Sequence, residues 1–578
     1  MIIIPNRENK IITQINKGDT LGDLWSSFNI DLVSNYGRIR NTRMIENNNS
    51  SFEANLGCAV AFRYFDSKWW AVAGSRVHSS SRTQTGFTAD VTASTPTTCS
   101  SDTSDIELFN GNMYVTSQTG LNKFTGSVWS TNAQTLNTNT PHLMTNYAER
   151  LYITDLYSKI YSMNTSDSVA ISSTNTLSFT NSLANVITFL RSASNTIWIG
   201  TINTQGGKGA IYEWNGVSTQ TNRSYRLESG GALSCVIKDD IPWIVDTNGR
   251  LMYWNGGSFI EVARFPIFPD ENILLYNAFS QINDRFIHPN GMSLVNGKIN
   301  ILINNLNDDF GATISERLPS GVWEYDENKG LYHKYSISYT GTATTIVTDY
   351  GQNRLSRVGA LLQAKVQNNA SGANGTLLAG ATYFTNASSI QSGIFFEDNI
   401  DTTQKYGYFV TNWISSLGLK DTWQKIFIKY RKFLASTDKI IVKYRIAEVT
   451  PTEVSITWTS TTTFTTTTNI LSKEGFEVEI IQGTGSGKTA HITLINVNAG
   501  TYTVTVDDTF TGVTTGTAKA RIQAWIKIGE VTGQTTESWG HQISKVSERI
   551  QLKVCMQFTG KDEISELAII NEVNQPMV

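Results

Sequence analysis

Between residues 60 and 330, apolar and polar positions follow one recurring pattern. A turn of the Asn, Asp or Gly type leads into a strand that carries an aromatic side chain. A glycine follows, and then a second aromatic strand that ends in Asn-Gly. The aromatics of the first strand recur at intervals of about 40 to 45 residues, the length of one four-stranded propeller blade. These aligned residues are Trp70, Tyr114, Tyr152, Trp198 and Trp243. The pattern therefore predicts a β-propeller over residues 51–345.

The second half of each unit gives two further expectations. Asn-Gly, as in Trp214-Asn215-Gly216, supplies the positive φ that a tight hairpin turn needs. The aromatic before it is expected to pack between neighbouring blades, because a large flat side chain there removes much apolar area from water. A degenerate copy at 321–326 closes the series. We expect about six blades, with five or seven left open, and a string of unrelated hairpins in a sandwich is the alternative.

Residues 1–50 do not fit the repeat and are predicted to form an N-terminal arm. The segment 23–32 alternates apolar and polar residues and predicts one strand. This strand either closes the propeller by pairing with its last blade or docks on a neighbouring subunit. Docking is favoured, because the polar stretch 38–50 is interpreted as an exposed arm or linker that would let the strand extend to a neighbouring subunit.

After residue 345 longer strands predict an antiparallel β-sandwich made of residues 346–469 and 523–578. Strands at 423–430 and 439–445 are expected to pair as a hairpin. In the strand from Ile550 to Phe558, apolar and polar residues alternate strictly, so we expect one buried face and one mostly polar face. Residues 470–522 lie between these halves and predict a small inserted β-domain, a barrel or ribbon displayed away from the core.

Composition supports an all-β chain and argues against several functional classes. Charged residues make up only 16% and aromatics 11% of the 578 residues, and no helical periodicity extends beyond about three turns. The net charge of −3 gives no global basic field for nucleic acid or acidic lipid. No apolar run approaches the roughly 18 residues of a membrane span. The N-terminal apolar run is interrupted by charge too early for a signal peptide.

The cysteines and histidines lack metal-binding spacing. Four widely separated cysteines are expected to be buried thiols in a protein folded in a reducing cytosol: Cys58, Cys99, Cys235 and Cys555. Six scattered histidines are expected to be surface or strand residues: His78, His142, His288, His333, His491 and His541. We therefore predict no metal site.

Two signals resemble catalytic or nucleotide-binding chemistry. The segment Gly483–Thr489 looks like a phosphate-binding loop, but Gln482 stands where the first glycine belongs, and a strand pattern follows in place of a helix. It is interpreted as a hairpin turn. Glycosidases need two facing carboxylates, and the aspartates at the propeller face are more simply explained as turn residues: Asp155, Asp239, Asp240, Asp246, Asp308 and Asp309. We predict no catalytic residue, no cofactor and no enzymatic activity.

The assembly as a whole resembles structural proteins of tailed bacteriophage virions, of the tail nozzle, hub and fibre-attachment type. Residues 475–490 and 500–506 are similar to small modules of such proteins, as is the opening 15–28. The resemblance implies a non-enzymatic component of the virion tail, made in the host cytoplasm. It would form a homo-oligomeric ring through arm and sandwich contacts, with the propeller projecting, other tail proteins as partners and passing contact with phage DNA in a channel.

An alternative is a receptor- or glycan-binding adhesin at the virion surface, and a third is a polysaccharide-degrading tail enzyme. Specific activity is to be sought where the blade pattern breaks. Three such places are the N-terminal arm, the irregular stretch Asn304–Phe310 and the inserted unit.

Overall fold

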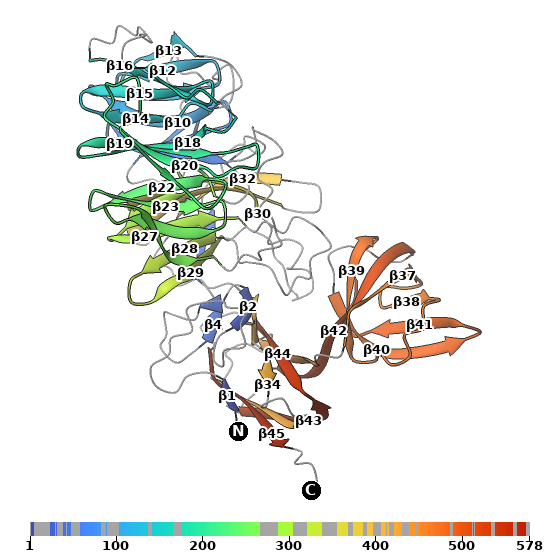
Figure 1. Cartoon of the computed structure of the whole chain (residues 1–578). Coiled ribbons are helices and arrows are strands. Elements are labelled where there is room, and N and C mark those ends of the chain that lie inside the picture. The colour runs from blue at the N-terminus through green and yellow to red at the C-terminus, as the bar shows by residue number, and fades with distance from the viewer. Residues whose placement is uncertain are drawn as a thin grey trace.

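The computed structural model is built from strands, and the part of the chain that it describes holds no helix (Figure 1). In Figure 1 the propeller occupies the top of the view, a sandwich lies below it and a barrel projects to the right. The described residues are 2–4, 24–28, 30–31, 39–41, 43–47, 58–81, 88–89, 103–136, 141–165, 176–181, 183–265, 287–304, 321–337, 355–367, 374–384, 390–396, 406–411, 413–415, 421–430, 438–446, 449–485, 489–510, 513, 515–532, 538–558 and 563–573.

Seven four-stranded antiparallel blades form the propeller. The first six follow chain order: β6 (Ala59–Phe65), β7 (Lys68–Ala73), β8 (Arg76–Ser81) and β9 (Thr88–Ala89); β10 (Thr103–Phe109), β11 (Asn112–Ser117), β12 (Gly120–Phe124) and β13 (Trp129–Thr135); β14 (Met144–Tyr147), β15 (Arg150–Asp155), β16 (Lys159–Met163) and β17 (Leu177–Ser178); β18 (Val186–Ala193), β19 (Thr196–Ile202), β20 (Ala210–Trp214) and β21 (Arg223–Arg226); β22 (Ala232–Lys238), β23 (Ile241–Asp246), β24 (Arg250–Trp254) and β25 (Phe259–Arg264); β26 (Met292–Val295), β27 (Lys298–Ile303), β28 (Gly321–Asp326) and β29 (Gly330–Ile337).

The seventh blade joins the two ends of the propeller. It consists of β30 (Leu355–Gln367), β31 (Asn374–Phe384), β32 (Ile390–Phe396) and, as its outer strand, β5 (Arg43–Asn47) from the N-terminal arm. The first strands of successive blades contact one another around the ring, and β30 contacts both β26 and β6. The blade is buried on both sides, against the sixth blade and against the first. The ring therefore has seven blades where about six were expected.

The boundary of the propeller also differs from the prediction. Residues 355–396 were assigned to the sandwich, yet their strands complete the ring. The strands of this blade lack the aromatic–glycine pattern of the others. Small residues replace it, because β30 and β31 approach β6 closely: a Cβ on Gly359 would lie 1.9 Å from the carbonyl oxygen of Ala59.

The arm strands pair within their own chain. Strand β2 (Leu24–Phe28) pairs with β33 (Tyr406–Thr411) of the sandwich, and β5 pairs with β32 and, in parallel, with β29. Strand β2 thus pairs with the sandwich and not with the last blade of the propeller, and its docking on a neighbouring subunit stays a prediction. The stretch that was interpreted as a linker supplies the closing strand instead.

The aromatic packing of the blades follows the prediction, and the turns follow it in part. At the predicted Asn-Gly sites, Gly216 and Gly256 have positive φ of 77° and 99°, whereas the asparagines before them do not. The two-residue turn between the first two strands has two positive φ angles in five blades, for example 47° and 72° at Asn110-Gly111, which matches the right-handed twist of a hairpin. The five aligned aromatics are at most 8% exposed. Each reaches the next blade: the ring centroids of Trp70 and Phe124 are 5.0 Å apart, and those of Trp198 and Trp254 are 5.3 Å apart. The expected packing between blades is confirmed.

The sandwich consists of two sheets that enclose an apolar core. One sheet contains β1 (Ile2–Ile4), β3 (Ile30–Asp31), β4 (Ile39–Asn41), β45 (Glu563–Val573), β35 (Asp421–Tyr430) and β43 (Ser538–Ser547); the other contains β2, β33, β34 (Ile414–Ser415), β44 (Arg549–Gln557), β36 (Lys439–Ile446) and the end of β42 (Gly516–Thr532). Strands β35 and β36 lie in different sheets, so the predicted hairpin between them is wrong. Their apolar residues face the same core from opposite sides.

The inserted unit is a closed six-stranded barrel. Its strands pair in the order β42, β37 (Thr452–Trp458), β38 (Thr463–Thr466), β41 (Thr501–Val506), β40 (Thr489–Asn498), β39 (Phe476–Gly483) and back to β42. Apolar side chains fill its interior. The barrel begins about twenty residues before the predicted limit at 470, because residues 452–466, which were assigned to the sandwich, form β37 and β38. The long strand β42 continues into the sandwich and joins the two units.

Candidate functional site

The axis of the propeller is filled by the chain itself. The segment 287–291, just before β26, crosses the ring and bonds to five of its first strands. Asn290 donates through Nδ2 to the carbonyl oxygen of Val60 at 3.0 Å and to Oδ1 of Asp105 at 3.1 Å, and its Oδ1 accepts from Arg191 at 2.7 Å. Two further hydrogen bonds join the segment to β22 and β30: Ser234 donates to the carbonyl oxygen of Pro289, and the N–H of Leu361 donates to that of Asn290. Hydrogen bonds thus hold this segment between five inner strands of the propeller.

Burial shifts the pKa values of groups around this segment. It lowers the pKa of His288 to about 3, aided by the nearby Arg191, and it raises the pKa of the carboxyl of Asp105, a rise that Arg63 opposes. Such shifts occur at active sites. Here Asp105 is occupied by the main-chain N–H groups of Ile106 and Met144 as well as by Asn290. The bonds of Asn290 join the segment 287–291 to β10 and β18.

The described aspartates that the sequence singled out lie in turns or at their edges, as their residue type suggested. Asp246 accepts from the N–H groups of Asn248 and Arg250 and from the Arg250 guanidinium, Asp155 accepts from the N–H of Leu156, and Asp240 accepts from the N–H of Ser194. Asp239 shares a turn with Asp240. Asp308 and Asp309 lie outside the described residues, as does nearly all of Asn304–Phe310.

The remaining sequence signals are also placed. Strands β39 and β40 pair antiparallel on either side of the glycine-rich segment, so the expected hairpin is confirmed where a P-loop would need a helix. Five histidines are buried and His541 is exposed. No group of three metal-ligating side chains occurs among the described residues. Cys58, Cys235 and Cys555 are buried, as predicted, and Cys99 lies outside the described residues.

A buried charge cluster joins the barrel to the sandwich, and sequence patterning did not reveal it. Lys443 of β36 bonds to Glu477 of β39 at 2.6 Å, and Lys553 of β44 lies 4.0 Å from the same carboxylate. Gln523 of β42 donates to Glu479 at 2.6 Å. The face of β44 that was predicted to be mostly polar is buried as well.

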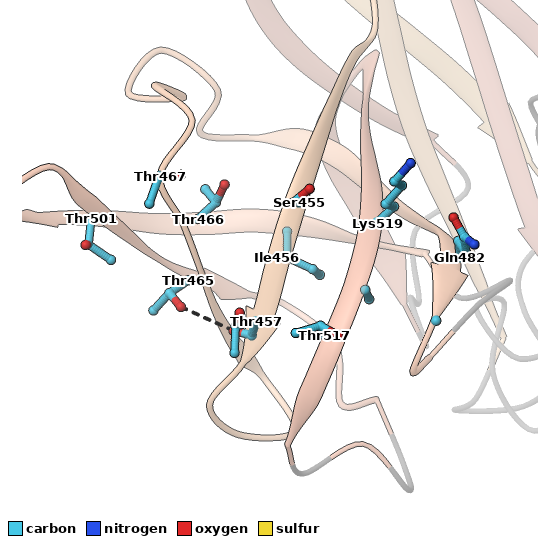
Figure 2. A pocket seen from close by; sticks show the side chains of 12 residues that line it. Ser455, Ile456, Thr457, Thr465, Thr466, Thr467, Gln482, Thr501, Thr517 and Lys519 are labelled. Atoms are coloured by element: carbon cyan, nitrogen blue, oxygen red, sulfur yellow. Dashed lines mark hydrogen bonds between the residues drawn. The ribbon is translucent and has the colours of Figure 1, made fainter.

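A groove of about 490 Å³ lies on the outer face of the barrel (Figure 2). Twelve residues from five neighbouring strands line it: Ser455, Ile456, Thr457, Thr465, Thr466, Thr467, Gln482, Gly483, Thr501, Thr517, Ala518 and Lys519. Six of them are threonines, and no aromatic or acidic side chain is among them. In Figure 2, Lys519 and Gln482 stand at one end and Thr465 and Thr501 at the other.

The groove exists because two strands separate. β37 and β38 pair only where Thr457 faces Thr465 and Trp458 faces Phe464. Beyond this point the strands diverge, while β37 continues along β42 with Thr457 opposite Thr517. Threonine is stiff at χ1, so its hydroxyl is held in few orientations. The result is a row of preoriented hydroxyl groups beside a strand edge.

The sequence contained a signal for this groove. The tract 459–468 is rich in threonine, and it was interpreted as a bracket around the insertion. Its alternation with buried residues, Phe464 among them, would have indicated an exposed threonine face on a strand.

Comparisons with known proteins add only distant likenesses. No family model matches the chain, and no curated protein matches it. Among solved structures it is similar to the computationally designed Ika8 protein (10% identity, 61% of this chain and 99% of that chain, TM-score 0.34) and to the WD40 propeller domain of Doa1 (10% identity, 62% and 98%, TM-score 0.38). It also matches an extracellular domain assigned to a hybrid two-component system of B. thetaiotaomicron (12% identity, 73% and 45%, TM-score 0.40), spanning less than half of that chain. With TM-scores this low, the propeller assignment rests on strand pairing. No described helix is long and apolar enough to cross a membrane.

Proposed function

We propose that this chain is a non-enzymatic structural protein of a bacteriophage tail whose copies assemble into a ring. The observation that carries the proposal is the outer strand of the sandwich. Strand β43 is ten residues long and is the last strand of its sheet among the described strands. Val546 on this strand is 54% exposed. A long edge strand of low charge is a template on which another chain can add a strand.

The sandwich offers a second edge at its opposite end. β2 is the last strand of the other sheet. Because β43 contacts β42 while β3 contacts β33, the β43 edge and the β2 edge lie at opposite ends of the sandwich. Two different edges on opposite ends suit a head-to-tail contact, and such contacts close into rings when the rotation permits. The ring contact would therefore join the β43 edge of one copy to the edge that the arm strand β2 offers on the next.

The propeller fits the role of a rigid projecting element. Its ring is closed by β5 and its axis is occupied by Asn290 and its neighbours. A passage for phage DNA would therefore be the lumen of the oligomeric ring and not the axis of the propeller. The other tail proteins would bind surfaces of the chain that the ring contacts do not cover.

The test is the oligomeric state of the purified protein, measured by electron microscopy and by size-exclusion chromatography with light scattering. We expect rings for the natural chain and their loss in Val546→Lys, which places a charge on the proposed edge. Val217→Lys is the matched control, because Val217 is a similarly exposed valine on the propeller. A chain that stays monomeric at all concentrations, or that maps to the capsid shell or head interior, contradicts the proposal.

The groove on the barrel favours a second candidate, a receptor- or glycan-binding adhesin at the virion surface. Cell binding by free monomers or trimers would support this candidate, and a ring without cell binding would support the connector.

A further inference from the structure

We propose that the groove on the barrel binds a polysaccharide that carries carboxylate groups. This inference gives the adhesin candidate a ligand class and rests on that candidate. It concerns the side chains that line the groove from Ser455 to Lys519.

The lining selects for a ligand rich in hydroxyl groups. Small-molecule sites of about 300–1,000 Å³ are ordinarily lined by apolar and aromatic side chains with few polar groups. Among the twelve lining residues of this groove, seven carry a hydroxyl group and one carries an amide. A hydroxyl both donates and accepts, so a row of them can match the alternating donors and acceptors of a sugar. Thr465 Oγ1 already donates to the carbonyl oxygen of Thr457, and Thr466 Oγ1 accepts from the N–H of Thr468. A sugar would bond to the other hydroxyl groups of the lining, Ser455, Thr457 and Thr517 among them, and an apolar ligand would not.

The charge at one end selects for an anion. Lys519 is the only charged side chain of the lining, and Gln482 stands opposite it on the neighbouring strand. The carboxylate of Glu453 on β37 is held by Arg521 at 2.7 Å. An ammonium and an amide side by side supply donors to a carboxylate, and hydrogen bonds between charged groups are the stronger ones.

An extended peptide is the competing occupant, since β37 offers a strand edge beside the groove. Peptides that add to an edge gain specificity from pockets that take alternate side chains. Here the positions beside β37 carry threonines and a serine in place of such pockets. The lining therefore favours the sugar.

The test is isothermal titration of the full-length protein with oligogalacturonate as the acidic probe and malto-oligosaccharide as the neutral one. We expect the acidic probe to bind more tightly. Lys519→Gln should weaken its binding about tenfold, the effect of losing one charge-assisted bond, and should leave binding of the neutral probe unchanged. Thr457→Val and Thr517→Val should weaken binding of both probes. Thr493→Val, an exposed threonine outside the groove, is the matched control and should change neither.

Two outcomes overturn the inference. One is absence of binding to either probe by a protein whose unfolding transition is normal. The other is binding that Lys519→Gln and the two threonine variants leave unchanged. The ring measurement is independent, so a protein that forms rings but binds no sugar contradicts the ligand assignment and leaves the connector proposal standing.

Discussion

Lys443 Nζ donates to Glu477 Oε2 at 2.6 Å, and both side chains are buried where the barrel meets the sandwich. Although burial opposes the charge on each group, Lys443, with help from Lys553, lowers the pKa of Glu477 to about 2, and Glu477 raises the pKa of Lys443. Burial lowers the pKa of Lys553, which lies over the rings of Tyr408 and Trp525. The negative charge of Glu477 thus attracts two lysines of the sandwich, Lys443 on β36 and Lys553 on β44.

Glu477→Gln should destabilise the chain by about 3–5 kcal/mol, because it leaves buried lysines without their counter-charge. Urea unfolding at neutral pH measures the loss. The control Glu453→Gln removes an exposed carboxylate paired with Arg521 and should change little. Equal effects of the two changes would contradict the assigned role of burial.

The same pair predicts an acid dependence. Because the folded-state pKa of Glu477 is below the ordinary value of 4.5, its stabilisation is complete above about pH 4.5 and is lost as pH falls towards 2. Unfolding free energies of the natural chain should decline over that range, and the decline should be shallower in Glu477→Gln. If the natural chain and Glu477→Gln lost stability in parallel as the pH fell, Glu477 would not be the source of the decline.

His288 predicts a second pH effect, in the propeller. Its pKa is lowered to about 3 by burial and by Arg191, so the neutral ring is the folded form. The contribution of His288 to the free energy of unfolding is fully present above about pH 6.5. It falls as the pH drops towards 3, by up to about 1.4 kcal/mol per pH unit. His288→Gln retains an acceptor for the N–H of Asn290 and should flatten the profile between pH 6.5 and 4.5, where Glu477 stays ionised. Tryptophan fluorescence in urea measures it; an unchanged slope would count against His288.

Gly359→Ala should weaken closure of the propeller. The added Cβ would lie 1.9 Å from the carbonyl oxygen of Ala59 on β6, so two strands must move apart, at a cost of about 1–3 kcal/mol. Gly257→Ala is the control, because its Cβ would meet only Asn255 Oδ1 at 3.9 Å. Hydrogen exchange of β6 and β30 should increase in the first variant only. Unchanged exchange would show that the ring closes without this contact.

Ala499→Asn should stabilise the barrel by about 0.5–1 kcal/mol. Ala499 has φ of 47° at the tip of the β40–β41 hairpin, before Gly500 at 81°. Asparagine tolerates this conformation better than alanine does. Ala499→Val should act in the opposite direction, since a β-branched side chain fits poorly there. Thermal unfolding followed by circular dichroism compares the three chains, and a rise in Tm with valine would refute the assigned strain.

Much of the fold was readable because its signals are local. The turn at Asn110-Gly111 and the aromatic at Trp198 are each specified within one hairpin, and repetition made the propeller recognisable. The strands at 423–430 and 439–445 were also placed correctly. The pairing of these two strands was predicted wrongly. Alternation of apolar and polar residues indicates that a strand has a buried face, but it does not indicate which strand lies beside it.

The candidate site was less readable for the same reason. Thr457, Thr465 and Thr517 come from three strands, and only the separation of β37 from β38 turns them into one groove. The charges of Lys443 and Glu477 are 34 residues apart in the chain and carry no pattern that predicts their burial.

The sequence by itself determined the blade repeat, its turns and the packing role of its aromatics, since these depend on backbone φ preferences and on apolar periodicity within about fifty residues. Only the tertiary structure decided that Arg43–Asn47 completes the seventh blade and that 287–291 fills the propeller axis. It also decided that a closed barrel carries a hydroxyl-lined groove. These three features depend on pairing between strand edges and buried polar groups that are far apart in the chain. Short-range sequence patterns do not predict such pairing.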